Sequence, residues 1–313
     1  MPDCGAELEF ADAESRLRIK CLLMRAAVII PVHNRRDVTL RCLQSLHSLR
    51  LPADFGIIVV DDGSTDGTAG AVAAAFPEVI IEHGNGELFW TGGIVQGMRR
   101  ALAEGAAFLF WLNDDCLPEA DALPRILKYL EDNPRTICGA SCFAKGGSEP
   151  VETGFRNRRA MNATGSVTDV DGLSGYCVGM PATVCAEIGF PDARRLPHYG
   201  ADSIYTLNAK RKGHRVVLLK EARANLLDEK PVQTVEERAR SSSLNLPAFI
   251  QATFFARKSR FFLKGQYWYH RCKYGFLPGG LLFLVKFFRW AWTMAFYWRR
   301  RSWPSVPHTV GSK

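Results

Sequence analysis

Short apolar runs alternate with amphipathic stretches along the first 230 residues of the chain. The side chains of these runs are typical of buried strands, which we predict over Ala26–Val32, Phe55–Val60, Glu78–Glu82 and Ala107–Leu112. The stretches between them predict helices over Val38–Leu49, Thr68–Phe76 and Gly92–Glu104. Strands that alternate with helices at this spacing predict an α/β fold with a mainly parallel sheet flanked by helices.

The pattern becomes less regular after Asn133. It predicts strands over Thr136–Phe143, Glu152–Phe155, Leu173–Met180 and Arg215–Leu219, and helices over Thr183–Ile188 and Ser203–Lys212. From Val235 onward helical patterns dominate, including a long one over Leu246–Phe262. We therefore expect an N-terminal extension over residues 1–25, an α/β domain over residues 26–230, and a helical, basic and aromatic C-terminal region over residues 231–313.

Two predicted strands run directly into adjacent carboxylates. Asp61-Asp62 follows the second strand, and Asn113-Asp114-Asp115 follows the fourth. Parallel strands bring these ends to one rim, where open α/β sheets bind ligands. Paired carboxylates beside an amide are hard oxygen ligands that hold Mg²⁺ or Mn²⁺ against a diphosphate. A polar turn before a helix that begins near Pro118 explains the later pair equally well.

Glycine-rich segments add little to this picture. Gly63-Ser64-Thr65 precedes a predicted helix, where free amides favour an anion, but the same residues also make ordinary turns. Neither Gly-x-Gly-x-x-Gly nor the phosphate-loop Gly-Lys-Ser pattern occurs. This absence argues against a dehydrogenase and against a phosphate-loop nucleotidase.

The composition is that of a globular protein, with 313 residues, 47% hydrophobic and 23% charged. Nine cysteines without Cys-x-x-Cys spacing favour reduced structural thiols over a zinc site. The first twenty residues carry five carboxylates and no apolar core, so we expect no secretory signal and a cytoplasmic protein.

The net charge of +8 is concentrated near the end of the chain, because no Asp or Glu follows Glu237. Gly279–Trp298 is the most apolar stretch and is long enough to cross a bilayer. Its polar residues share one helical face, which favours an amphipathic helix lying on an anionic membrane; they are Lys286, Arg289, Thr293 and Tyr297. A spanning helix, stacking on nucleic acid and packing against a partner subunit are the alternatives.

Three segments together closely resemble family 2 glycosyltransferases: Val28-Ile29-Ile30-Pro31-Val32-His33-Asn34-Arg35, the run Val59–Thr68 and Trp111–Asp115. The resemblance covers Ala26–Leu227 and implies the Rossmann-like GT-A fold. The segment Gly84–Gly93 resembles the loop that these enzymes place between nucleotide and sugar. Together with His198–Asp202, it is similar to bacterial enzymes that build surface polysaccharides, rhamnosyltransferases among them.

Carried over by position, the resemblance implies a role for each matching residue. Asp61 would accept a hydrogen bond from the base, Asp114 would face the ribose, Asp115 would hold the divalent cation, and Asp202 would be the general base. The other donor-side residues would be Pro31, Val32, Asn34, Asn85, Gly86, Trp90 and Asn113. The acceptor-side candidates are Trp90, Gly175, Tyr176, His198 and Tyr199.

The chain also departs from the family pattern. Ala201 replaces the glutamate that usually precedes the base, and Ala224-Asn225-Leu226 lacks the histidine that many members add as a metal ligand. Without the resemblance, Asp202 reads as the N-cap of a helix.

The resemblance implies an inverting enzyme that moves a sugar from a UDP- or dTDP-sugar to a glycan or lipid-linked acceptor in cell-surface polysaccharide synthesis. We expect a Mg²⁺ or Mn²⁺ cofactor, peripheral attachment to the inner face of the plasma membrane and no nucleic-acid partner, with oligomerisation left open. The alternatives are a sugar nucleotidyltransferase and a non-catalytic membrane-associated scaffold. The nucleotidyltransferase would carry a glycine-rich basic loop after its first strand, where this chain has His33-Asn34-Arg35-Arg36.

Overall fold

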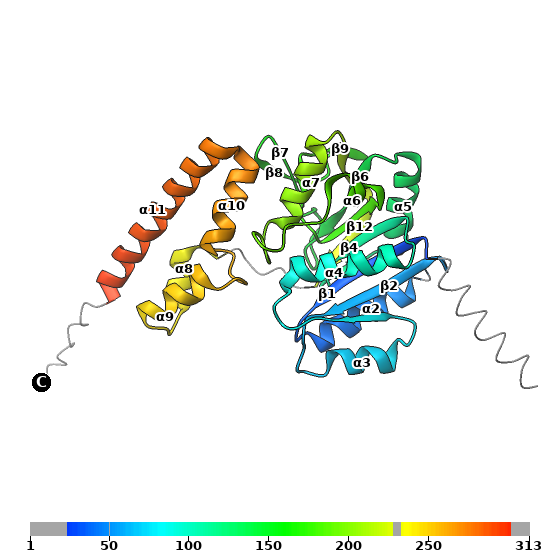
Figure 1. Ribbon diagram of the computed structural model, residues 1–313, viewed down its shortest axis with the longest axis horizontal. Helices are drawn as coiled ribbons and strands as arrows, with labels where there is room; N and C mark the ends of the chain where they lie inside the picture. Colours follow the sequence, from blue (N-terminus) through cyan, green and yellow to red (C-terminus); the bar gives the residue numbers. More distant parts are fainter. Residues whose placement is uncertain (1–23, 50, 228–232, 302–313) are drawn as a thin grey trace, which may run out of the picture. The chain divides into compact units, whose positions relative to one another are not determined.

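The computed structural model describes residues 24–49, 51–227 and 233–301 (Figure 1). It divides into two compact units, Met1–Glu229 and Lys230–Lys313. The predicted N-terminal extension lies almost wholly outside the described residues.

The first unit is built on a nine-stranded sheet in the order β3-β2-β1-β4-β11-β6-β12-β5, with β9 also paired to β12. Its strands are β1 (Ala26–Val32), β2 (Phe55–Asp61), β3 (Ile80–His83), β4 (Phe108–Leu112), β5 (Cys116–Pro118), β6 (Thr136–Phe143), β9 (Val167–Asp169), β11 (Cys177–Pro181) and β12 (Arg215–Leu226). The first four in spatial order are parallel, as are β6 and β12, whereas β5, β9 and β11 run antiparallel to their neighbours. The predicted α/β fold with a mainly parallel sheet is confirmed.

Helices cover both faces of this sheet (Figure 1). Alternating residues of β1 show the division, because Val28 and Ile30 pack on one side while Ala27 and Ile29 pack on the other. The first side is covered by α2 (Arg36–Ser48), α3 (Thr68–Ala75) and α5 (Ala122–Asp132). The second is covered by α4 (Phe89–Ala103), α6 (Thr183–Ile188) and α7 (Ala201–Arg211). Burial on both faces explains why the strands are continuously apolar.

A small three-stranded sheet of β7 (Gly154–Arg156), β8 (Arg159–Met161) and β10 (Gly172–Leu173) lies beside α7. The predicted strand over Leu173–Met180 is therefore two strands, β10 and β11, separated by a turn. This turn contains Gly175 and Tyr176, two of the predicted acceptor-side residues.

The second unit is helical, with α8 (Val235–Ser241), α9 (Leu246–Ile250), a π-helical turn η1 (Gln251–Phe255), α10 (Leu263–Tyr274) and α11 (Phe276–Arg301). The predicted single helix over Leu246–Phe262 is wrong. The helix widens at η1 and ends at Ala256, whose backbone is extended. This break lets Phe249, Phe254 and Phe261 all enter the core of the unit.

Candidate active site

The loops that follow β1 and β2 bind each other at the carboxyl edge of the sheet. The strand register places Pro31 beside Val60 and Val32 beside Asp61. The Asn34 side-chain oxygen accepts a hydrogen bond from the Thr65 amide at 2.7 Å, and the Asn34 amide donates to a serine hydroxyl in the same loop at 2.8 Å. Four of the predicted donor-side residues, Pro31, Val32, Asn34 and Asp61, are thus brought together at neighbouring strand ends.

The two carboxylates at the end of β2 are buried and hold backbone amides. Asp61 accepts a hydrogen bond from the Ser64 amide at 2.9 Å. Asp62 accepts three, from Gly86 at 2.8 Å, Leu88 at 3.2 Å and Phe89 at 2.8 Å. Asp62 therefore fixes the loop that contains Asn85 and Gly86, and also the first residue of α4. This role was not predicted from the sequence.

The carboxylates at the end of β4 face a cation instead. Arg35 donates from Nε to Asp114 at 2.8 Å and from Nη2 to Asp115 at 2.9 Å. Thr39 adds a longer bond to Asp114 at 3.3 Å. Asp114 is buried, whereas the Asp115 side chain is 27% exposed. Asp115 is thus the member of the pair that solvent or a ligand reaches more easily.

Burial and charge act in opposite directions on this cluster. Burial raises the pKa of Asp114 to about 6, although the Arg35 guanidinium beside it lowers that pKa. For Arg35, burial lowers the pKa but the two carboxylates outweigh it and raise the pKa above its ordinary value. Arg35 therefore stays protonated and keeps a positive charge next to the predicted donor site.

Trp90 links the end of β4 to the predicted base. Its indole Nε1 donates to the Asn113 side-chain oxygen at 2.8 Å. The far edge of the same ring lies against Gly175, where an added Cβ would come within 2.5 Å of Trp90 and 3.2 Å of the Asp202 Cβ. A glycine is therefore required for this close approach. Trp90, Asn113, Gly175 and Asp202 form one continuous set of contacts.

Asp202 lies in the first turn of α7 but is not its N-cap, because Gly200 occupies that position with φ of 84°. The interpretation of Asp202 as a cap is therefore wrong. Its two oxygens accept hydrogen bonds from the Gly175 and Ser203 amides, both at 2.7 Å. Burial raises the pKa of Asp202, although these amide donors lower it. Each carboxylate oxygen keeps a second lone pair for another donor.

The remaining acceptor-side candidates lie beside α4 and the turn before β11. The Trp90 amide donates to His198 Nδ1 at 3.3 Å, and the rings of His198 and Tyr199 meet edge to face with centroids 4.6 Å apart. Tyr199 is 49% exposed. The Tyr176 carbonyl accepts a hydrogen bond from the Asn113 amide at 2.9 Å. The other four candidates are thus linked to Trp90, either directly or through Asn113 and His198.

The donor set fits a divalent cation that the protein holds by few ligands. Among the described residues, no three side chains of His, Cys, Asp or Glu converge. The end of β12 runs past Asp115, since the Leu227 amide donates to the Asp115 carbonyl at 2.8 Å, but its residues up to Leu227 supply no histidine. Mg²⁺ and Mn²⁺ sites that rely on one or two carboxylates take their other ligands from substrate phosphates and water.

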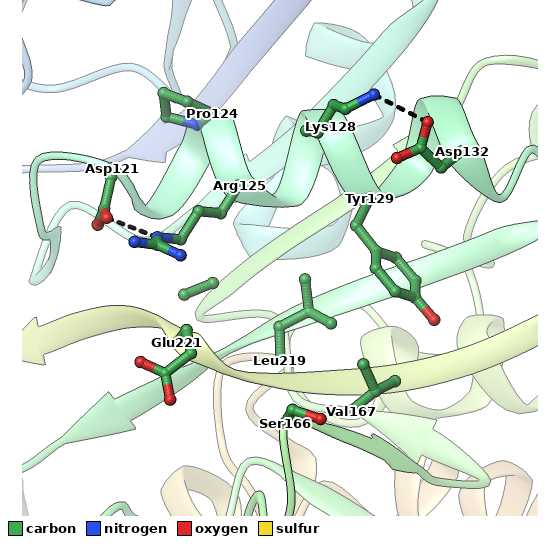
Figure 2. Close-up of a pocket in the computed structure, with 11 residues that line it drawn as sticks. Asp121, Pro124, Arg125, Lys128, Tyr129, Asp132, Ser166, Val167, Leu219 and Glu221 are labelled. Carbon is green, nitrogen blue, oxygen red and sulfur yellow. Dashed lines mark hydrogen bonds and ion pairs between the residues drawn. The ribbon is translucent and has the colours of Figure 1, made fainter.

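A separate groove of about 560 Å³ lies between α5 and the irregular middle of β12 (Figure 2). Tyr129, Val167 and Leu219 line it, and both of its cations are paired, Arg125 with Asp121 and Lys128 with Asp132. Glu221 adds a further negative charge. None of the predicted site residues lines it. Because its cations are neutralised by neighbours, the groove offers an anionic donor little.

Comparison with known proteins identifies the family of the domain that carries these residues. The family described as "Glycosyl transferase family 2" matches residues 27–180 of this chain. This range includes Asp61, Asp115 and Gly175. Residues 27–180 of this chain thus form a family 2 glycosyltransferase domain.

The curated relatives of this glycosyltransferase match it over part of their length. A "PGL/p-HBAD biosynthesis glycosyltransferase" of Mycobacterium bovis is 34% identical over 112 residues, which cover 34% of this chain and 42% of the relative. An "uncharacterized glycosyltransferase" of Bacillus subtilis, YfnE, is 29% identical over 121 residues, which cover 37% of this chain and 30% of the relative. The chain thus spans less than half the length of the curated relatives that it matches.

Solved structures share the fold. TarS of S. aureus in complex with UDP-GlcNAc aligns with a TM-score of 0.54 at 15% identity, over 85% of this glycosyltransferase and 81% of TarS. The mannosyltransferase PcManGT of Pyrobaculum calidifontis, with GDP-Man and Mn²⁺, aligns with a TM-score of 0.51 at 16% identity, over 89% and 82%. The GT-A fold implied by the sequence motifs is confirmed.

Proposed function

We propose that this family 2 glycosyltransferase is an inverting hexosyltransferase that uses Asp202 as its base. The observation that carries the proposal is the contact set through Trp90, which joins the base to the end of β4. Donor carboxylates and base thereby lie on one rim, as a reaction between a nucleotide sugar and an acceptor hydroxyl requires. A non-catalytic scaffold has no need of a buried carboxylate at this point.

In the proposed reaction, the acceptor oxygen attacks the anomeric carbon as its O–H bond breaks, and the proton passes to Asp202. The bond between the anomeric carbon and the diphosphate oxygen breaks in the same step, and the nucleoside diphosphate leaves with the electron pair. One base and no covalent intermediate suffice, which agrees with Ala201 in place of a second carboxylate. The raised pKa of Asp202 brings it closer to the range in which a carboxylate accepts a proton well.

Asp115 is the residue that we propose holds the divalent cation, Mg²⁺ or Mn²⁺, with Asp114 beside it facing the ribose. When bound, the cation stabilises the negative charge that develops on the leaving diphosphate. The exposure of Asp115 supports this division, since Asp114 is buried and shared between Arg35 and Thr39. Arg35 already supplies one positive charge at the same carboxylates.

The proposed donor is a UDP- or dTDP-sugar, and the proposed acceptor is a glycan or lipid-linked glycan of cell-surface polysaccharide synthesis. Support for a nucleotide-sugar donor comes from TarS and PcManGT, whose structures hold UDP-GlcNAc and GDP-Man, and of these two TarS holds a UDP-sugar. Support for a cell-envelope acceptor comes from the motifs Gly84–Gly93 and His198–Asp202. We place the enzyme in the cytoplasm at the inner face of the plasma membrane, with no nucleic-acid partner.

The experiment that tests this proposal is titration of the purified protein with a panel of UDP-, dTDP- and GDP-sugars, with and without Mn²⁺. We expect one nucleotide class to bind, more tightly with the cation, and the product formed on an added acceptor to have the opposite anomeric configuration by NMR. No metal-dependent binding of any nucleotide sugar, or a retained configuration, would contradict the proposal.

A further inference from the structure

The second unit uses only one side of α11 for its own core. Trp290 and Met294 are buried and pack with Phe254 and Phe261; the Trp290 ring lies 5.7 Å and 5.4 Å from those two phenylalanine rings. Tyr297 and Lys286 lie on the same side, and Lys286 donates to Gln266 at 2.9 Å.

This arrangement corrects an expectation from the sequence. Lys286, Arg289, Thr293 and Tyr297 were expected to form the polar face of an amphipathic helix. Of these four, Arg289 is exposed. Lys286 instead lies 5.0 Å above the Trp290 ring and is half-buried. The side of the helix that the sequence makes polar is therefore largely the side that packs inside the unit.

The opposite side of α11 is apolar and exposed. Leu277 and Trp292 are each 76% exposed, and Leu281 and Phe288 are each 65% exposed. Leu284, Val285 and Phe296 complete the set. Their spacing of three, four, seven and eight residues places all seven on one stripe of the helix. We call these seven residues the outer stripe.

An exposed apolar stripe of this size indicates a surface that something else covers. Within the described residues, no helix is sufficiently long and apolar to cross a membrane. The stripe also contains Trp292, whose amphipathic ring is of the kind that settles at the depth of lipid headgroups. A helix with one apolar side exposed along its length is suited to lie in the plane of a membrane surface.

The charge of the region decides between a membrane and a second copy of the chain. Residues 238–313 contain fourteen Lys and Arg and no Asp or Glu. Two copies joined through α11 would bring like charges together, which opposes association. An anionic lipid surface attracts the same charges. Charge complementarity therefore favours lipid.

We propose that the outer stripe of α11 inserts into the headgroup region of an anionic bilayer, with the helix axis parallel to the membrane. This inference rests on the membrane location proposed above and names the residues that produce it. The basic residues of the unit draw it to anionic lipid, and the apolar stripe holds it there after salt has screened the charges.

The test is co-sedimentation of the full chain with neutral phosphatidylcholine vesicles and with vesicles that also contain phosphatidylglycerol, at low and high salt. The stripe variant is Leu281→Asn, Phe288→Asn and Trp292→Asn, all at exposed positions. The matched control changes three exposed apolar residues outside the stripe, Leu244→Asn, Phe255→Asn and Leu282→Asn. Neither variant changes the charge, and nucleotide binding checks that the first unit is intact.

We expect wild type and control to bind anionic vesicles and to retain part of this binding at high salt. The stripe variant should bind at least about a hundred-fold more weakly. Equal binding by all three proteins would overturn the assignment of the stripe but leave the membrane location standing. Absence of vesicle binding by wild type would overturn both. A dimer in light scattering that only the stripe variant loses, without vesicle binding, would assign the stripe to a second copy.

Discussion

The ends of β2 and β4 look alike in sequence but differ in what their carboxylates bind. Both strands are apolar and both end in adjacent aspartates. At β2, Asp62 is buried and accepts three backbone amides, two from the loop before α4 and one from the first residue of α4. At β4, Asp114 and Asp115 share the guanidinium of Arg35.

This difference separates two kinds of contribution to one site. A carboxylate that accepts three amides, as Asp62 does, shapes the loop around a ligand and has little capacity left for the ligand itself. A carboxylate held by an arginine side chain can exchange that guanidinium for another positive charge. We therefore assign Asp62 to the shape of the site and Asp115 to its chemistry.

The largest effect should come from Asp115→Ala. Without this carboxylate the cation loses its protein ligand, so we expect transfer to fall by about three orders of magnitude or more and metal-dependent nucleotide affinity to weaken. The melting temperature should change little because Asp115 is partly exposed. Calorimetry of nucleotide binding with and without Mn²⁺ measures this. Asp121→Ala, which removes an exposed aspartate nearby in sequence, is the control; unchanged metal-dependent affinity in Asp115→Ala would show that the assignment is wrong.

The second largest effect should come from Asp62→Ala, which should lower stability, whereas Asp115→Ala should lower activity. Three amides would lose their acceptor, so we expect the free energy of unfolding to fall by about 3 kcal/mol or more. Asp62→Asn, which keeps one acceptor oxygen, should fall between the two proteins. Chemical denaturation measures this. If Asp62→Ala were as stable as wild type and Asp115→Ala were unfolded, the assignment of Asp62 to the shape of the site and of Asp115 to its chemistry would be wrong.

A smaller effect concerns pH at the end of β4. The folded pKa of Asp114, about 6, is above its ordinary value of 3.8, so the folded state penalises the ionised form. That penalty is fully present above about pH 6 and is relieved as the pH falls through this pKa. As the pH falls from about 7 to about 4, the unfolding free energy of wild type should rise by up to about 3 kcal/mol relative to that of Asp114→Asn. Denaturation with a chelator present measures it, and a flat or opposite difference would contradict the pKa shift.

The smallest effect should come from Gly175→Ala, which tests the link from β4 to the base. The added methyl would meet Trp90 and shift it away from Asp202. We expect turnover to fall by about ten-fold to a hundred-fold, with nucleotide binding nearly unchanged. Gly165→Ala is the control, because its Cβ would have no neighbour closer than 3.9 Å. Equal loss in both variants would remove the special role of this contact.

The part of the fold that was predictable from sequence is the part that periodicity determines. Strands buried on both faces are continuously apolar, so β1, β2 and β4 were predicted to within a residue or two. The helix α4 begins three residues before its predicted start, because Asp62 binds the amide of Phe89 and allows a turn that the sequence pattern does not indicate.

The parts that were not predictable depend on contacts between distant residues. Arg35 belongs to the first motif, but its partner Asp114 lies 79 positions further along the chain. A pairing over this distance leaves no periodic signal in the sequence. The same holds for α11, whose sequence shows two different sides but not which side the neighbouring helices cover. The side that is covered carries Lys286, which donates a hydrogen bond to Gln266, and Trp290, which packs against the phenylalanines of the core.

The measurement that tests the central claim most directly is turnover and donor affinity of Asp202→Asn, with the surface change Asp132→Asn as control. Asparagine keeps the size of the side chain and can still accept an amide hydrogen bond, but it cannot take a proton from the acceptor hydroxyl. We predict that turnover falls by about two to four orders of magnitude while donor affinity stays near that of wild type. Turnover within a few-fold of wild type would contradict the account, because Asp202 would then only position Gly175 and the first turn of α7.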